Sequence, residues 1–185
     1  LEKLIFRKIL AVLRQTAVIA NLKMTYPFVP KSNKKISSGD YWVTKLSNKS
    51  YAVGVVIDVP PSDLKLTREI VIGLLDWNGN EIPKEVDLMN SKILKQGHAH
   101  IKTISEYSSG IIGNIDFTKS SIEPLILIGS YGANNPEWNL MKGYKIVGDY
   151  KKSDREKYGK ASYWGYDYLN EIAENVFVLK NKDWL

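Results

Sequence analysis

The clearest pattern along the chain lies between residues 38 and 60, where two apolar runs around a polar loop predict a β-hairpin. Two runs rich in aromatic and β-branched side chains, 41–46 and 51–59, flank the polar loop 47–50. The expected facing pairs are Leu46 with Tyr51, Thr44 with Val53, and Trp42 with Val55. The opposite face carries Tyr41, Val43, Lys45, Ala52, Gly54 and Val56. Because both faces are mainly apolar, we expect the sheet to curl toward a barrel or to lie under a helix.

Further apolar runs predict additional strands, and a helical stripe follows them. The strand-like runs cover residues 69–77, 98–104, 110–117, 124–129 and 144–148. The acidic segment 83–88 begins with a proline, which favours a surface loop. The spacing of Ser153 and Glu156 is that of a capping box and predicts a brief helical turn. After Ser162, a candidate N-cap, apolar residues recur at helical spacing. The stripe consists of Tyr163, Tyr166, Leu169, Ile172, Ala173 and Val176.

The first 35 residues differ from the rest of the chain in charge. They hold eight lysines and arginines against one glutamate, a net +7, so within the total of +6 the remaining residues carry −1. Apolar positions at Ile5, Ile9, Val12 and Leu13 predict an amphipathic helix there, followed by an extended lead-in. Met24 is a second candidate start, in which case residues 1–23 lie upstream of the natural chain.

The expected fold class is therefore α+β. We predict a small, strongly bent antiparallel β-sheet or partly open barrel, with an N-terminal helix and a C-terminal covering helix. Residues 1–35 form the basic helix and lead-in, and residues 36–185 form a single domain of ordinary size.

Candidate chemistry is sparse. The chain has no cysteine, so it has neither a disulfide nor a thiolate metal site, and we expect a cytoplasmic protein. It contains no nucleophile elbow and no glycine-rich phosphate loop, and we expect no enzyme activity and no cofactor. His98 and His100 share one face of a predicted strand, but two imidazoles need a third ligand, and ordinary polar strand residues are the favoured interpretation. No run is long and uncharged enough for a membrane span.

An interface is the function that the residue pattern favours over catalysis. Five tryptophans and eleven tyrosines are many for this length, and most of them are expected in the core. Trp77, beside an Asn-Gly turn, and Trp138, in the long loop 130–139, are better candidates for partner contacts. Acidic residues cluster in sequence near Trp77, although a solvated acidic loop is the plainer interpretation of that cluster. The candidate partner-binding residues are Asp76, Trp77, Glu81, Glu85, Asp87 and Trp138.

The hairpin also resembles a known family. Gly39-Asp40, Leu46, Tyr51-Ala52, Gly54 and Val56 resemble the opening of the immunity protein 26 family of bacterial polymorphic and contact-dependent toxin systems. Residues 143–148 and 161–176 are similar to later parts of that family, which commonly has a proline where this chain has Lys45. The resemblance implies a cytoplasmic α+β protein that binds and neutralises a cognate toxin domain without chemistry of its own.

A nucleic-acid-binding β-barrel module is the alternative from a different class. In that alternative, the basic N-terminal arm grips phosphates, and binding falls steeply with salt. The near-neutral charge of residues 36–185 favours the immunity interpretation and makes nucleic acid the less expected partner.

Overall fold

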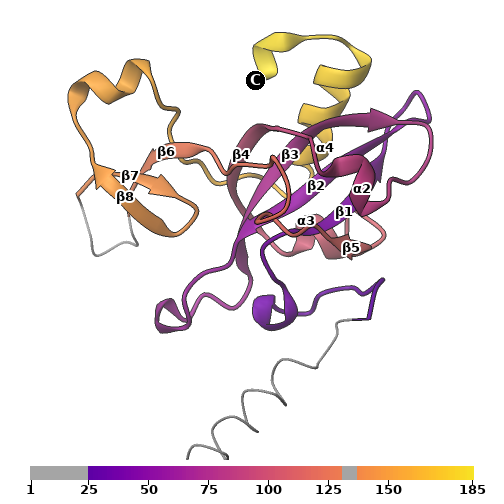
Figure 1. Cartoon of the computed structure of the whole chain (residues 1–185), viewed down its shortest axis with the longest axis horizontal. Coiled ribbons are helices and arrows are strands. Elements are labelled where there is room, and N and C mark those ends of the chain that lie inside the picture. Colours follow the sequence, from indigo (N-terminus) through magenta and orange to yellow (C-terminus); the bar gives the residue numbers. More distant parts are fainter. Residues whose placement is uncertain (1–24, 131–136) are drawn as a thin grey trace, which may run out of the picture.

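The computed structural model describes residues 25–130 and 137–185, and it contains two antiparallel sheets and a few short helices. The larger sheet has the order β4-β3-β2-β1-β5 (Figure 1). Its strands are β1 (Asp40–Lys45), β2 (Tyr51–Asp58), β3 (Glu69–Gly79), β4 (Ile93–His100) and β5 (Gly113–Asn114). The expected mixed α and β composition is thus confirmed, whereas the expected N-terminal helix lies outside the described residues.

The hairpin of β1 and β2 forms as expected, but its register differs from the prediction by one residue. Trp42 pairs with Gly54 instead of Val55, and Lys45 pairs with Tyr51. The cause is the turn, in which Lys49 adopts a left-handed conformation with φ of 72°. The Lys49 N–H donates to the Leu46 carbonyl, and the Leu46 N–H donates to the Ser50 carbonyl. The turn therefore covers residues 47–49 instead of the expected 47–50, which moves every facing pair by one position.

Both faces of the larger sheet are buried, as the apolar pattern predicts. One face forms the α4-side core, where helix α4 (Tyr168–Ala173) packs Leu169 and Ile172 over Trp42 and its neighbours. Full burial of each of these two side chains stabilises the fold by about 1.5–3 kcal/mol. The other face forms the α2-side core, which helix α2 (Glu85–Leu88) closes with Leu88. The sheet stays open, since no strand pairing among the described residues joins β4 to β5.

The C-terminal helix is shorter than predicted. It begins at Tyr168, and Tyr163 is 70% exposed instead of lying on a buried stripe. The preceding segment runs parallel to β4 instead: the His98 N–H donates to the Ser162 carbonyl, and the Trp164 N–H donates to the His98 carbonyl, both at 2.8 Å. Because these backbone groups form hydrogen bonds with the edge strand of the sheet, they are not available to form the first turn of a helix. A π-helical turn, η4 (Glu174–Val178), continues α4.

Three other expectations are corrected. The predicted strand 98–104 ends at His100 and is followed by helix α3 (Lys102–Ser105). The predicted strand 110–117 is reduced to β5 and an isolated bridge between Phe28 and Ile111. The predicted surface loop 83–88 contains α2, because the fully buried side chain of Leu88 packs this segment against the sheet. The remaining short turns are η1 (Asn33–Lys35), η2 (Ser62–Leu64), η3 (Lys152–Glu156) and η5 (Lys182–Trp184).

A second sheet of three strands lies to one side of the first (Figure 1). It consists of β6 (Ile126–Gly129), β7 (Asn139–Lys142) and β8 (Lys145–Asp149), so the runs predicted at 124–129 and 144–148 are confirmed as strands. Side chains of the larger sheet hold its ends. Gln96 accepts a hydrogen bond from the Leu125 N–H, and Asp58 accepts one from the Tyr144 N–H, both at 2.9 Å. The brief helical turn expected near Ser153 is η3.

Candidate functional site

An open groove of about 800 Å³ lies where β3 leads into α2. The end of β3 supplies Trp77 and the connection supplies Glu81 and Ile82, while α2 and its start supply Lys84, Val86 and Asp87. The structure therefore brings together three of the predicted partner-binding residues, Trp77, Glu81 and Asp87. We call this surface the Trp77 groove.

The apolar side chains of the Trp77 groove are unusually exposed. Ile82 is 57% exposed and Val86 is 67% exposed, whereas Trp77 is partly buried against the α2-side core. The tryptophan ring lies against Gly79, where a Cβ would come within 2.6 Å of Cζ2. Glycine at that position leaves room for the indole ring. Apolar side chains around a fixed aromatic ring are typical of a protein-binding surface.

The acidic residues around the groove divide into two kinds. Asp87 accepts a hydrogen bond from the Lys84 N–H at 2.8 Å and caps α2, and Asp76 accepts one from the Lys92 N–H at 2.6 Å beside a register shift in the sheet. Both carboxylates thus hold the local backbone. Glu81 and Glu85 are exposed and make no hydrogen bond or ion pair with other described residues. These two are the charges available to a partner.

The electrostatic effect of this acidic segment reaches the core. The Tyr41 hydroxyl donates to the Pro83 carbonyl at 3.4 Å beneath the groove. Burial raises the pKa of Tyr41, and the negative charges of Glu85 and Asp87 raise it further. Tyr41 therefore stays a neutral hydrogen-bond donor that supports the groove from below.

Trp138 is not part of the groove. It is 51% exposed and lies just before β7 on the second sheet, in a small hollow of about 80 Å³ with Tyr150, Arg155 and Lys160. The sequence grouped it with the acidic segment only because it was a loop tryptophan, and the structure assigns it to another surface.

The two histidines pack against aromatic rings. His98 stacks on Tyr163 at a centroid distance of 5.0 Å and meets Tyr144 edge-on at 5.3 Å, and His100 lies beside Tyr166. Burial lowers the pKa of His98, and its Nδ1 has no hydrogen-bond partner among the described residues. Across 25–130 and 137–185, no three His, Cys, Asp or Glu residues gather closely enough to hold a metal ion.

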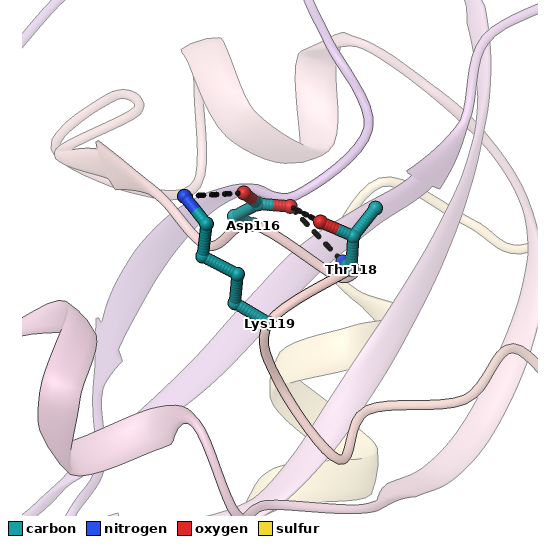
Figure 2. Close-up of polar contacts among 3 residues, drawn as sticks. All are labelled: Asp116, Thr118 and Lys119. Atoms are coloured by element: carbon teal, nitrogen blue, oxygen red, sulfur yellow. Dashed lines mark hydrogen bonds and ion pairs between the residues drawn. The ribbon is translucent and has the colours of Figure 1, made fainter.

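A polar cluster after β5 has a local structural role (Figure 2). Asp116 accepts hydrogen bonds from the Thr118 N–H at 3.0 Å and the Thr118 hydroxyl at 2.6 Å, and it forms an ion pair with Lys119 at 3.1 Å. The Thr118 hydroxyl, followed by Lys119, lowers the pKa of Asp116. These contacts span four residues and fix a turn.

Sequence reasoning missed one surface altogether. A cleft of about 540 Å³ separates β4 from the second sheet, and its charged and hydroxyl side chains come from segments far apart in the chain. They include Lys95, Glu123, Lys142, Lys157, Tyr158 and Lys160. The only sequence signal is the density of lysine and tyrosine between residues 142 and 160. We call this surface the intersheet cleft.

No protein-family model matches the chain, and searches of curated proteins and solved structures also gave no match. No described helix is long and apolar enough to cross a membrane.

Proposed function

We propose that this protein is an immunity protein that acts in the cytoplasm by binding a cognate bacterial toxin domain, without catalysis, through the Trp77 groove. The observation that carries the proposal is the groove itself, in which Ile82 and Val86 are exposed beside a held tryptophan. The hairpin resemblance supplies the class of partner. An inhibitor of this kind needs a stable surface and no reactive group.

The chemistry of the groove suits a basic partner surface. Apolar side chains at the centre of an interface exclude water and slow dissociation, while charged side chains at the rim speed encounter. Here Glu81 lines the groove and Glu85 lies beside it as the first residue of α2, and neither carboxylate is ion-paired with a described residue. Lys84 lies between them in sequence. A nuclease toxin presents cations where it binds phosphates, so a surface that meets those cations blocks the toxin's substrate site.

The test is a binding measurement with the toxin-like product of the adjacent gene. The charge-reversal variant carries Glu81→Lys and Glu85→Lys and leaves Asp76 and Asp87 intact, because those two carboxylates hold the backbone. We expect Kd to weaken by about ten-fold or more, mainly through slower association, and the salt dependence of association to decrease.

The matched control reverses two exposed acidic residues on other elements, Asp63 in η2 and Glu171 in α4. It changes net charge equally and should leave Kd within about three-fold of the wild type. A second variant, Ile82→Ser with Val86→Ser, should speed dissociation. Equal weakening by the groove and control charge variants would refute the proposal, and so would the absence of binding by the wild type.

A further inference from the structure

The intersheet cleft is open and rich in uncompensated positive charge. Its lining includes residues of β4 in the larger sheet and of β6 in the second sheet. Its lining contains four lysines, at positions 95, 142, 157 and 160, against one acidic side chain, Glu123. A volume of about 540 Å³ falls in the range of small-molecule and cofactor sites.

None of these lysines is ion-paired among the described residues, where the two ion pairs are Lys102 with Glu106 and Lys119 with Asp116. Lys95 donates to the backbone carbonyl of Trp184. The Lys157 ammonium lies 4.9 Å from the centre of the Tyr158 ring. Neither contact neutralises a charge, and among the side chains that line the cleft four lysines stand against Glu123 alone. A lining of this composition attracts anions.

Aromatic rings adjoin the cationic part of the cleft. Lys160 lines the cleft and also lines the small hollow that holds Trp138, Tyr150 and Arg155. The Arg155 side chain donates to the Tyr150 hydroxyl, which holds the guanidinium beside the phenol ring. Trp138 leaves about half of its surface exposed. Lys160 therefore belongs both to the cleft, with its other lysines, and to the hollow, with its two aromatic side chains.

We infer that the intersheet cleft and this hollow together bind a nucleotide unit, with its phosphates among Lys142, Lys157 and Lys160 and its base against Trp138 and Tyr150. Lysine ammonium groups hold phosphates as point charges, and aromatic faces stack on bases. An acidic peptide would satisfy the lysines but would leave the aromatic hollow without a planar partner. The same unit occurs as a free nucleotide and within a single strand of nucleic acid.

This inference does not depend on the Trp77 groove, which lies on a different part of the chain and has acidic side chains at its rim. It also differs from binding by the basic N-terminal arm, because it assigns the contacts to residues after position 94. A cleft variant in the full chain separates the two: binding by the arm survives the loss of the cleft lysines.

The experiment follows the fluorescence anisotropy of a labelled oligothymidylate, titrated with the full chain at about 50 mM salt. The cleft variant carries Lys142→Ala, Lys157→Ala and Lys160→Ala. The matched control removes three exposed lysines outside both the cleft and the N-terminal arm, with Lys45→Ala, Lys65→Ala and Lys92→Ala. Both variants lose three charges, and urea unfolding checks that each remains folded.

We expect the cleft variant to lose at least ten-fold in affinity, and the slope of log K against log salt to become shallower by about 2, as for the loss of three phosphate contacts to a single strand. The control variant should stay within about three-fold of the wild type. Trp138→Ala should weaken binding by roughly ten-fold through lost stacking. Competition by ATP would identify a free nucleotide as sufficient, and its failure to compete would identify the strand.

Three outcomes would overturn the inference. The first is no change in anisotropy when the wild-type chain is added to the labelled oligothymidylate, together with no direct binding of ATP to the chain. The second is an equal loss of affinity in the cleft and control variants, which indicates general charge attraction. The third is full affinity in Trp138→Ala, which reduces the surface to a phosphate site with no recognition of the base.

Discussion

The close approach of Trp42 to Gly54 gives a sharp test of the observed hairpin register. A Cβ added at Gly54 would lie 2.3 Å from Cζ2 and 2.4 Å from Cε2 of the Trp42 indole. Real Cβ contacts do not come that close, and Trp42 is fully buried, so the ring has no solvent into which to move. With the register predicted from the sequence, Trp42 would face Val55 and Gly54 would point to the other side of the sheet.

Gly54→Ala should therefore destabilise the protein by about 1–3 kcal/mol, the usual cost of overpacking a core. Gly148→Ala in β8 is the matched control, since its nearest atom, Cδ1 of Leu140, lies 3.7 Å from the added Cβ. There the loss of unfolded-chain entropy should make alanine neutral or stabilising by about 0.4–1 kcal/mol. The difference between the variants is a large part of the stability of a typical domain.

The assay is urea unfolding followed by far-UV circular dichroism, with a double-mutant cycle to identify the contact. Trp42→Phe removes the part of the ring that would clash, so Gly54→Ala should cost less in that background. A coupling free energy of about 1 kcal/mol or more is expected. If Gly54→Ala is no more destabilising than Gly148→Ala, or if the cycle is additive, the Trp42–Gly54 pairing is refuted.

Two further predictions concern the partly buried His98 and helix α2, which lines the Trp77 groove. Burial lowers the pKa of His98 below its usual 6.5, so the unfolded chain takes up a proton that the folded chain refuses. The contribution of His98 to the free energy of unfolding should be fully present above about pH 6.5 and should fall as the pH is lowered toward the folded pKa. Urea unfolding at several pH values across this range checks the prediction. The free energy of unfolding should depend less on pH in His98→Phe, whose ring still packs between Tyr144 and Tyr163. In α2, Leu88→Ala should cost about 2–5 kcal/mol, whereas Val86→Ala should change stability by less than about 0.5 kcal/mol; equal effects would contradict the placement of α2 on the sheet.

The larger sheet could be predicted from sequence in outline because its strands are long and strongly apolar. The runs 41–46, 51–59 and 69–77 correspond to β1, β2 and β3, and burial of both faces follows from their composition. The register could not be predicted, since it depends on Lys49 adopting a left-handed conformation. Lysine carries no signal for that conformation, whereas glycine or asparagine would have indicated it.

The extents of two helices were predicted wrongly from the sequence, and for a different reason. The stripe from Tyr163 to Val176 has helical spacing, but its first part is held to β4 by two backbone hydrogen bonds that local sequence cannot reveal. The segment 83–88 shows the reverse case, because one buried leucine converts an acidic stretch into a short helix on the sheet. In both cases a contact with a distant strand decides between local alternatives of similar propensity.

The candidate surfaces follow the same division between local and distant contacts. The Trp77 groove was found in part because its residues lie within twelve positions of one another, so composition alone indicated an acidic surface with a tryptophan. The intersheet cleft was missed because Lys95 comes from β4, Lys142 from β7, and Lys157 and Lys160 from the segment after η3. Net charge concealed it as well: residues 36–185 are nearly neutral because acidic side chains elsewhere, those of the groove among them, offset the lysines of the cleft. A near-zero total charge thus excludes neither a basic nor an acidic partner when the fold places opposite charges on separate surfaces.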